Sequence, residues 1–249
     1  MAGHSHWARI KRAKASNDSR RGKVWSKLSR AIIVAARNGG GDPDMNLSLR
    51  YAIDAAKADN MPKDTIERAV KKGTGGLEGA RFEELSYEGY GPGGAAIICA
   101  VLSDNRNRTA PEIKRIFEQR GGNLGATNCV AWMFESRGVI IVSADAVDEE
   151  SLTDLALEAG ADDLQQGDGA FELTCDPSAL DGLRKALSGA DIKIESAEVS
   201  MIPSSTVTLA GDEARKMIRL IEALEDQDDV QKVYSNFEIS EADMEKYAG

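Results

Sequence analysis

The order of strand-like and helical segments between residues 139 and 202 is the feature that most limits how this chain can fold. Short apolar or alternating runs, typical of strands, are interrupted by two stretches with helical spacing of apolar residues. The segments fall at residues 139–142 (strand), 151–159 (helix), near 164 and at 170–174 (two strands), 178–188 (helix) and 192–202 (strand). This β-α-β-β-α-β order predicts a ferredoxin-like, split βαβ sheet with its helices on one face.

The segments before this unit predict a second sheet. Residues 82–88 and 95–102 are strand-like and flank a turn rich in glycine and proline, so we expect a hairpin. A threonine and a glutamate three residues apart form a capping box for a helix over residues 109–120. Residues 130–134 are again strand-like.

The tail after Pro203 contains one amphipathic helix, followed by one strand over residues 230–239. One helix and one strand are too few to form a core of their own. We therefore expect them to join the sheet begun at residues 82–134. The ferredoxin-like unit is then an insertion in that domain.

The N-terminal region is predicted to be helical. Residues 23–37 have helical periodicity, with an apolar arc opposite a basic face. The glycine-rich run at residues 38–43 ends this helix. Two further helices follow, one ending near Asn60 and one that begins at Met61-Pro62 and ends at Gly73.

These segments predict an α+β multidomain protein, with a helical N-terminal domain followed by two α+β domains, the second inserted in the first. The predicted domains are residues 1–80, residues 81–134 with 204–249, and residues 135–203. The longest apolar run has eight residues, far fewer than the ~20 that a membrane-spanning helix requires. Three scattered cysteines without a Cys-x-x-Cys pair fit a reducing cytoplasm.

Charge is distributed unevenly along the chain. The formal net charge is −10, but residues 1–80 carry 16 Lys and Arg against 8 Asp and Glu, whereas residues 81–249 carry 15 against 33. Residues 1–37 alone hold ten basic residues and one acid. A polyanion would be attracted by the first region and repelled by the second, so the N-terminal region is predicted to bind nucleic acid. This prediction requires its cations to be kept apart from the chain's own carboxylates.

Candidate contacts follow from this pattern. Most are lysines and arginines suited to phosphate, while Trp7 could stack on a base and His4 could lie near the backbone or a base. Arg106 and Arg108 lie in a predicted strand-to-helix loop that either grips phosphate or serves only as a turn. The candidate nucleic-acid-binding residues are His4, Trp7, Lys11, Arg12, Lys14, Lys23, Lys27, Arg30, Arg37, Lys63, Arg106 and Arg108.

The sequence contains little that indicates a catalytic, metal-binding or dinucleotide-binding site. His4 and His6 are the chain's two histidines, and no Cys, Asp or Glu lies near them in sequence to complete a metal site. The glycines of residues 89–94 match G-x-G-x-x-G, but a strand-like run follows where a dinucleotide site needs a helix. We therefore expect no enzyme activity, no metal and no cofactor.

Six segments together carry a resemblance to a known family: residues 3–11 (GHSHWARIK), 34–43 (VAARNGGGDP), 60–69 (NMPKDTIERA), 87–94 (YEGYGPGG), 104–109 (DNRNRT) and 121–125 (GGNLG). Through these segments the chain resembles the YebC/PmpR family over essentially its whole length. The resemblance implies a three-domain cytoplasmic protein with a helical N-terminal domain, generally described as a DNA-binding transcriptional regulator. His6 stands where lysine is usual, Leu47 where proline is usual, and residues 127–129 replace a run of Gly and Ser.

Other members of that family, including a mitochondrial translational activator of cytochrome c oxidase, resemble ribosome-associated factors that assist decoding of stretches such as consecutive prolines. The sequence thus predicts a non-enzymatic, nucleic-acid-binding regulator of gene expression. A DNA-binding transcriptional regulator is the first candidate, and a ribosome- or rRNA-associated translation factor is the alternative. A third class, a protein that uses its basic tail to bind an acidic protein, also stays open.

Overall fold

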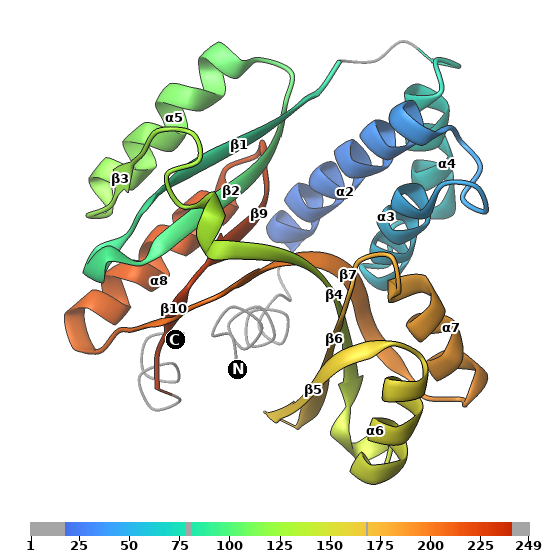
Figure 1. The fold of residues 1–249 in the computed structure, drawn as a ribbon. Helices are drawn as coiled ribbons and strands as arrows, with labels where there is room; N and C mark the ends of the chain where they lie inside the picture. Colours follow the sequence, from blue (N-terminus) through green and yellow to red (C-terminus); the bar gives the residue numbers. More distant parts are fainter. Residues whose placement is uncertain (1–17, 78–80, 168, 241–249) are drawn as a thin grey trace. The chain divides into compact units, whose positions relative to one another are not determined.

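The computed structural model describes residues 18–77, 81–167 and 169–240 (Figure 1). They divide into two compact units: an inserted unit, residues 134–204, and a main unit made of the segments on either side of it. No helix in these described ranges is both long and apolar enough to cross a lipid bilayer.

The inserted unit is a four-stranded antiparallel sheet covered by two helices. In space the strands follow the order β5-β6-β4-β7, and every neighbouring pair is antiparallel. Each βαβ crossover therefore passes over one strand, which confirms the predicted ferredoxin-like arrangement. Along the chain its elements are β4 (Phe134–Ser143), α6 (Glu149–Glu158), β5 (Ala161–Gly167), β6 (Ala170–Cys175), α7 (Leu180–Gly189) and β7 (Ile194–Pro203).

The two helices of the inserted unit pack against each other and cover the sheet through their apolar stripes (Figure 1). On α6, Leu152 and Ala156 are four residues apart and buried, and on α7, Leu180, Leu183 and Leu187 are fully buried. Spacings of three and four residues place these side chains on one side of each helix, which explains the packing.

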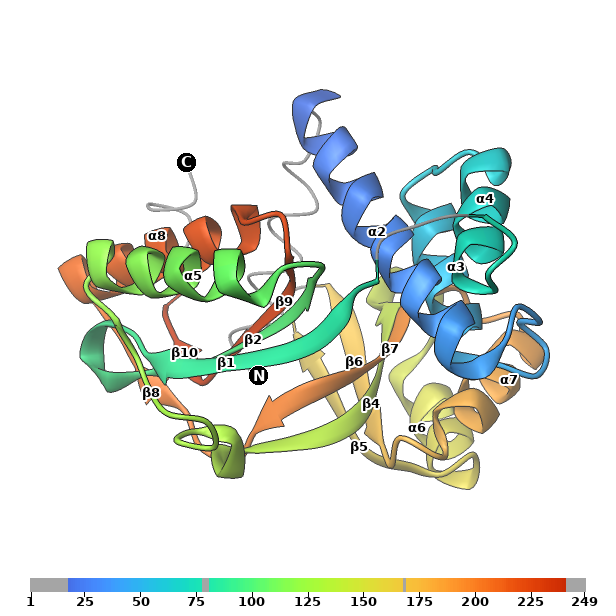
Figure 2. The same ribbon diagram turned by 90° about the horizontal axis from the view of Figure 1, so that it is seen from above.

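The main unit contains a second antiparallel sheet, with strand order β3-β1-β2-β9. β1 and β2 form the predicted hairpin, and β9 pairs with β2, so the tail of the chain returns to this sheet as expected. α5 and α8 lie side by side on one face of the sheet (Figure 2). The elements are β1 (Glu83–Tyr90), β2 (Ala96–Ser103), α5 (Arg106–Gln119), β3 (Asn123–Leu124), α8 (Gly211–Asp226) and β9 (Val230–Ser235), with a small parallel pair of β8 (Val207–Thr208) and β10 (Phe237–Glu238).

Two local predictions in this unit are wrong. α5 begins at Arg106 rather than Thr109, because the side chain of Asn105 accepts a hydrogen bond from the Arg108 amide and caps the helix one turn earlier. Thr109 is therefore inside the helix and fully buried. The strand expected at residues 130–134 is a short 3₁₀ turn, Ala131–Met133, that leads into β4.

Three helices precede the sheet in the main unit: α2 (Asp18–Gly39), α3 (Leu47–Ala58) and α4 (Lys63–Gly73). α2 packs against both of the others. Asn46 caps α3 by accepting from the Leu49 amide, and its side-chain amide donates to the carbonyl oxygens of Ala35 and Gly40 at the end of α2. The shared core consists of Ile32, Ile33, Ala36, Leu49, Ala56, Met61, Ile66 and Ala69.

Gly73 permits the close approach of α4 to α2. The sequence predicts that Gly73 ends this helix, and α4 does end at Gly73, with Thr74 as the cap residue. A Cβ at this position would lie 2.5 Å from the carbonyl oxygen of Ile33 and 2.6 Å from Cβ of Ala36. Glycine is therefore required here by the contact between two helices.

We expect Gly73→Ala to lower the free energy of unfolding by about 1–3 kcal/mol, because the added methyl group overpacks the contact between α2 and α4. Urea unfolding would measure the change. Gly22→Ala, in α2, is the matched control, since nothing lies within 4 Å of an added Cβ there. The control should be neutral or stabilising by up to ~1 kcal/mol. Equal stability of the two variants would contradict this account of Gly73.

Candidate nucleic-acid interface

Seven of the predicted contact residues lie in the described part of the chain. They fall on α2, at the start of α4 and in the first turn of α5. The remaining predicted contacts lie outside the described residues: His4, Trp7, Lys11, Arg12 and Lys14.

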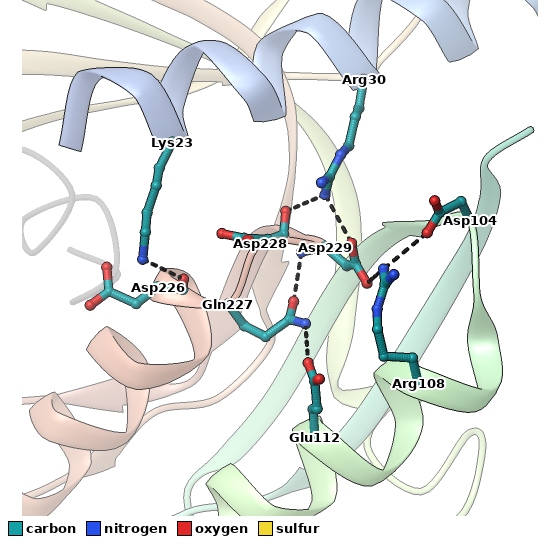
Figure 3. A pocket seen from close by; sticks show the side chains of 9 residues that line it. All are labelled: Lys23, Arg30, Asp104, Arg108, Glu112, Asp226, Gln227, Asp228 and Asp229. Atoms are coloured by element: carbon teal, nitrogen blue, oxygen red, sulfur yellow. Dashed lines mark hydrogen bonds and ion pairs between the residues drawn. The ribbon is translucent and has the colours of Figure 1, made fainter. Parts of the chain in front are cut away.

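Two lysines of α2 contact the end of α8. We call residues 225–229, which are the last two residues of α8 and the three residues that join it to β9, the acidic linker. Lys23 Nζ donates to the carbonyl oxygen of Asp226 at 3.4 Å (Figure 3), and Lys27 Nζ donates to the carbonyl oxygen of Glu225. Carbonyl groups in the last turn of a helix have no partner within the helix and carry partial negative charge. The two lysines therefore satisfy the C-terminus of α8.

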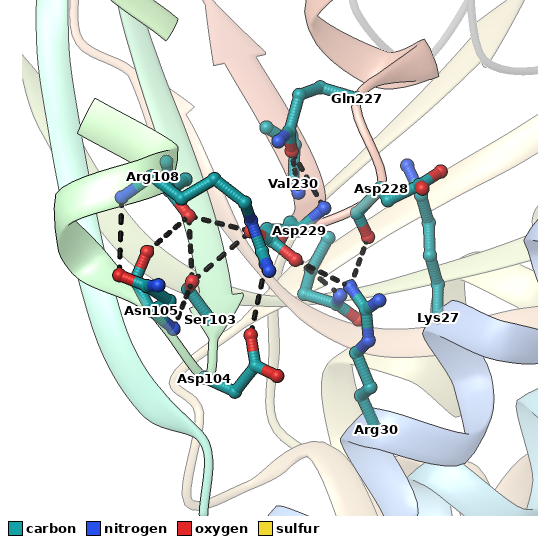
Figure 4. A network of polar contacts seen from close by, with 12 residues as sticks. Lys27, Arg30, Ser103, Asp104, Asn105, Arg108, Gln227, Asp228, Asp229 and Val230 are labelled. Carbon is teal, nitrogen blue, oxygen red and sulfur yellow. Dashed lines mark hydrogen bonds and ion pairs between the residues drawn. The ribbon is translucent and has the colours of Figure 1, made fainter. Parts of the chain in front are cut away.

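Arg30, one turn further along α2, reaches the same linker. Its guanidinium donates to the carbonyl oxygen of Asp228 and forms an ion pair of 2.9 Å with the carboxylate of Asp229 (Figure 4). Its side chain is 18% exposed, whereas that of Asp229 is 2% exposed. This pair is largely withdrawn from water, so it is a structural contact between α2 and the sheet.

Asp229 connects four elements of the main unit. Besides Arg30, its carboxylate accepts hydrogen bonds from the hydroxyls of Ser103 at 3.1 Å and Thr109 at 2.6 Å. It also forms an ion pair of 2.8 Å with Arg108, which reaches Asp104 as well (Figure 4). Asp229 thus joins α2, the end of β2, the first turn of α5 and the start of β9.

Burial by itself would raise the pKa of the Asp229 carboxyl. Hydrogen bonds from Thr109, Arg108 and Ser103, together with the positive charge of Arg108, outweigh burial and lower this pKa below its ordinary value. The carboxylate is therefore the stable form, and the network is present when Asp229 is ionised.

Gln227 fixes the course of the linker. Its side-chain carbonyl oxygen accepts from the amides of Asp229 at 2.6 Å and Val230 at 3.0 Å, and its amide group donates to Glu112 at 2.9 Å (Figure 3). These bonds hold the turn that presents the Asp229 carboxylate to its partners.

A pocket of about 520 Å³ lies between α2, α5 and the linker (Figure 3). Five of its nine lining residues are acidic and three are basic, so it does not suit a phosphate group. Within the described ranges, no group of three His, Cys, Asp or Glu is placed to hold a metal ion. The lining residues are Lys23, Arg30, Asp104, Arg108, Glu112, Asp226, Gln227, Asp228 and Asp229.

The expectation that the cations of the N-terminal region are kept apart from the acidic part of the chain is wrong for Lys23, Lys27 and Arg30. They were predicted as a free face because the helical pattern shows which residues share a side, not what packs against that side. Whether any of the three also binds nucleic acid stays a prediction.

The other predicted cations differ in their partners. Lys63 forms an ion pair of 3.7 Å with Glu67 and is 86% exposed. Arg108 belongs to the Asp229 network, whereas Arg106 is exposed and has no carboxylate within ion-pair distance among the described residues. The two arginines of one motif thus have different environments. Arg37 is exposed at the end of α2.

The C-terminal half of α4 carries three cations that the sequence analysis did not select: Arg68, Lys71 and Lys72. Arg68 and Lys71 are exposed and Lys72 is half-buried, and across the described structure none of them has an ion pair. The lysine pair was interpreted as complementing the helix C-terminus. The backbone of Arg37 lies close to the end of α4, since a Cβ on Gly73 would lie 3.3 Å from the Arg37 amide nitrogen.

Family comparisons agree with this architecture. The "TACO1/YebC protein N-terminal domain" matches residues 5–76, and the "TACO1/YebC second and third domain" matches residues 82–237. The chain belongs to the TACO1/YebC family. This confirms the resemblance drawn from the sequence motifs.

Curated TACO1/YebC relatives match over nearly their whole length. A protein of Pelotomaculum thermopropionicum is 55% identical over 97% of this chain and 100% of its own, and one of Geobacter sulfurreducens is 52% identical over 99% of both. Both are named as a probable transcriptional regulatory protein. A crystal structure of a conserved hypothetical protein from Aquifex aeolicus is 48% identical, with a TM-score of 0.83 over 90% of this chain and 93% of that one.

Asp229 is the residue of this TACO1/YebC chain that sequence reasoning missed most completely. It ends a run in which four of five residues are acidic, which is typical of a solvated surface. A usable signal would have been the position of this run directly before a strand, since a carboxylate at a strand end can be drawn into the sheet. The cations of α4 were missed because Lys71 and Lys72 were interpreted as complementing the helix C-terminus.

Proposed function

We propose that this chain is a non-enzymatic, cytoplasmic regulator of gene expression that binds nucleic acid through its N-terminal helical region. The observation that carries the proposal is a group of cations on α4 that have no ion pair among the described residues, Arg68, Lys71 and Lys72. We call this group the α4 cation cluster. The names of the curated relatives favour duplex DNA as the first candidate target.

The α4 cation cluster suits a phosphate backbone better than the predicted face of α2. The cations of α2 donate to carbonyl oxygens and to a buried carboxylate, so a phosphate would have to displace those partners. Arg68 and Lys71 have no such competitor in the described structure and are three residues apart, on the same side of α4. The sequence before residue 18 is also basic, but it lies outside the described residues.

Affinity for nucleic acid should depend strongly on salt. If about 5–8 phosphates are neutralised, the logarithm of the association constant should fall against the logarithm of salt concentration with a slope of roughly −4 to −7. Fluorescence anisotropy with labelled duplex DNA and with structured RNA, each over a range of salt, would measure this slope. A flat response for both ligands would contradict the proposal.

Structured RNA, including ribosomal RNA, is the second candidate, and one observation favours it. α3 and α4 are joined by four residues, as in a helix-turn-helix, whose second helix places its N-terminal residues against base edges. The N-terminal end of α4 exposes Asp64 and Glu67. If this end entered a groove of DNA, the two carboxylates would be repelled by the phosphates. Binding by the basic C-terminal half instead suits recognition of backbone shape, which is common for RNA.

The two candidates can be separated in one experiment. Duplex DNA and a structured RNA should be compared at equal salt, together with co-sedimentation with ribosomes before and after nuclease treatment. Tighter binding to DNA and no co-sedimentation would support a transcriptional regulator. Tighter binding to RNA with salt-sensitive co-sedimentation would support a ribosome-associated translation factor.

A further inference from the structure

Trp132 is unusually exposed for a tryptophan, at 75% of its surface. The chain has three tryptophans in 249 residues and is only 5% aromatic. Trp132 lies in a 3₁₀ turn at the end of a loop over residues 125–133, which follows β3 and belongs to the main unit. Because a large aromatic surface in water is costly, an exposed tryptophan on a fixed loop points to a binding role.

The loop that carries Trp132 is held by a buried carboxylate. Glu88 of β1 is 4% exposed, and its two carboxylate oxygens accept hydrogen bonds from three backbone amides of the loop. These donors are Asn128 at 2.8 Å, Val130 at 2.9 Å and Ala131 at 2.8 Å. Three hydrogen bonds to one buried side chain hold the backbone next to Trp132 in place.

A second aromatic ring lies beside Trp132. The indole nitrogen of Trp132 and the hydroxyl of Tyr90 both donate to the carbonyl oxygen of Cys129, each at 3.1 Å. Tyr90 is 37% exposed. The polar atoms of both rings are thus already bonded to the protein, which fixes the rings and leaves their faces for stacking.

A small pocket that contains one cation adjoins the same loop. It has a volume of about 80 Å³, and its lining includes Arg106, Ser86, Thr127 and Glu88, whose carboxylate oxygens already accept from the three loop amides. Arg106 has no ion pair among the described residues, so its charge is open to an anion. Ser86 and Tyr90 share one face of β1 and are four residues apart, about 13 Å along a strand. A short run of consecutive nucleotides in an extended strand can span that separation.

We propose that Trp132 and Tyr90 stack on an unpaired nucleobase while Arg106 pairs with a neighbouring phosphate. The loop and the Arg106 pocket together form a subsite for single-stranded nucleic acid. This inference rests on the proposed function and extends it by naming the unpaired nucleotide as ligand. The hydroxyl and guanidinium groups of the Arg106 pocket suit a nucleotide better than an apolar protein surface.

The test compares two RNA probes, a hairpin with an unpaired loop and a blunt duplex of the same stem. We expect Trp132→Ala to weaken binding of the hairpin about 5- to 150-fold and to leave binding of the duplex unchanged. Trp132→Phe keeps an aromatic face and should retain most of the affinity. Arg106→Ala should weaken hairpin binding and reduce the salt slope by about 1.

Two matched variants control for general effects. Arg115→Ala removes another exposed arginine of α5 that has no ion pair in the described structure and lies half a helical turn away from the side of Arg106. Met45→Ala removes an apolar side chain that is 84% exposed. Neither should change binding of the hairpin, and thermal unfolding should be similar for all variants.

The outcomes separate this inference from the proposed function. If the wild-type protein binds the hairpin and Trp132→Ala binds it equally well, the subsite is wrong and the proposed function stands. Equal losses for hairpin and duplex would also overturn it, because stacking on an unpaired base acts on the hairpin alone. If the wild-type protein binds no nucleic acid even at low salt, the proposed function fails and the subsite with it.

Discussion

Replacing Asp229 by alanine is expected to lower the free energy of unfolding by about 3–5 kcal/mol, the usual effect of removing one partner of a buried ion pair. Arg30 would lose its carboxylate, and the hydroxyls of Ser103 and Thr109, in residues that are 1% and 0% exposed, would lose a shared acceptor. Chemical denaturation, followed by circular dichroism, would measure the change.

Asp228→Ala is the matched control for this variant. Asp228 is adjacent and exposed, and its backbone carbonyl, which accepts from Arg30, is retained in the variant. Its stability should therefore stay within about 0.5 kcal/mol of the wild type. If both variants are equally stable, Asp229 does not hold the network together.

Acid titration gives a second readout for Asp229. Because its folded pKa is lowered from the ordinary value of 3.8, its ionisation stabilises the protein above that value, and this contribution is lost as pH falls through the folded pKa. Part of the acid sensitivity of the wild type below about pH 4 should thus be absent in Asp229→Ala. An unchanged acid dependence would assign the sensitivity to other carboxyls.

Reversing the charges of Arg68, Lys71 and Lys72 to glutamate is expected to weaken nucleic-acid binding by roughly 100-fold or more near 0.15 M salt. Loss of three phosphate contacts removes about 2 decades of affinity at that salt and reduces the salt slope by about 3, before repulsion by the new carboxylates is counted. Anisotropy titrations with DNA and RNA would measure both quantities.

The control for this triple variant carries the same change in net charge elsewhere. Arg115, Lys193 and Arg219 are exposed, and none has an ion pair among the described residues. Their reversal should affect binding far less. Because acidic residues near a helix C-terminus cost about 0.3–1 kcal/mol each, thermal unfolding of the α4 variant must also be measured. Equal binding losses in both triple variants would show a general charge effect and contradict the α4 cation cluster as the interface.

Much of the fold was predictable because its patterns are local. The β-α-β-β-α-β order fixes the topology of the inserted unit, since split crossovers require the middle strands to lie between their partners. The return of the tail to the first sheet was predictable because one helix and one strand cannot bury an apolar face alone. The capping box at Thr109 failed because two capping signals compete there, and Asn105 acts one turn earlier.

The candidate site was less predictable, since its decisive contacts join residues far apart in the chain. Lys23 and Asp226 are 203 residues apart, and Arg30 and Asp229 are 199 apart. The helical pattern of the sequence identified the basic face of α2. It could not indicate that lysines on this face would donate to carbonyl oxygens at the end of α8. The exposure of Trp132 was unpredictable for the same reason. It depends on a loop that is held by Glu88, a residue of β1 that is distant in the sequence.

The sequence by itself determined the periodicities, the order of elements, the segregation of charge and the family of this protein, because these depend on neighbouring residues. The tertiary structure alone decided which cations are compensated and which are left for a ligand. The physical reason is that a charge is neutralised by whatever lies within a few ångströms of it. In this chain those neighbours are supplied by packing of α2 against a segment about two hundred residues away.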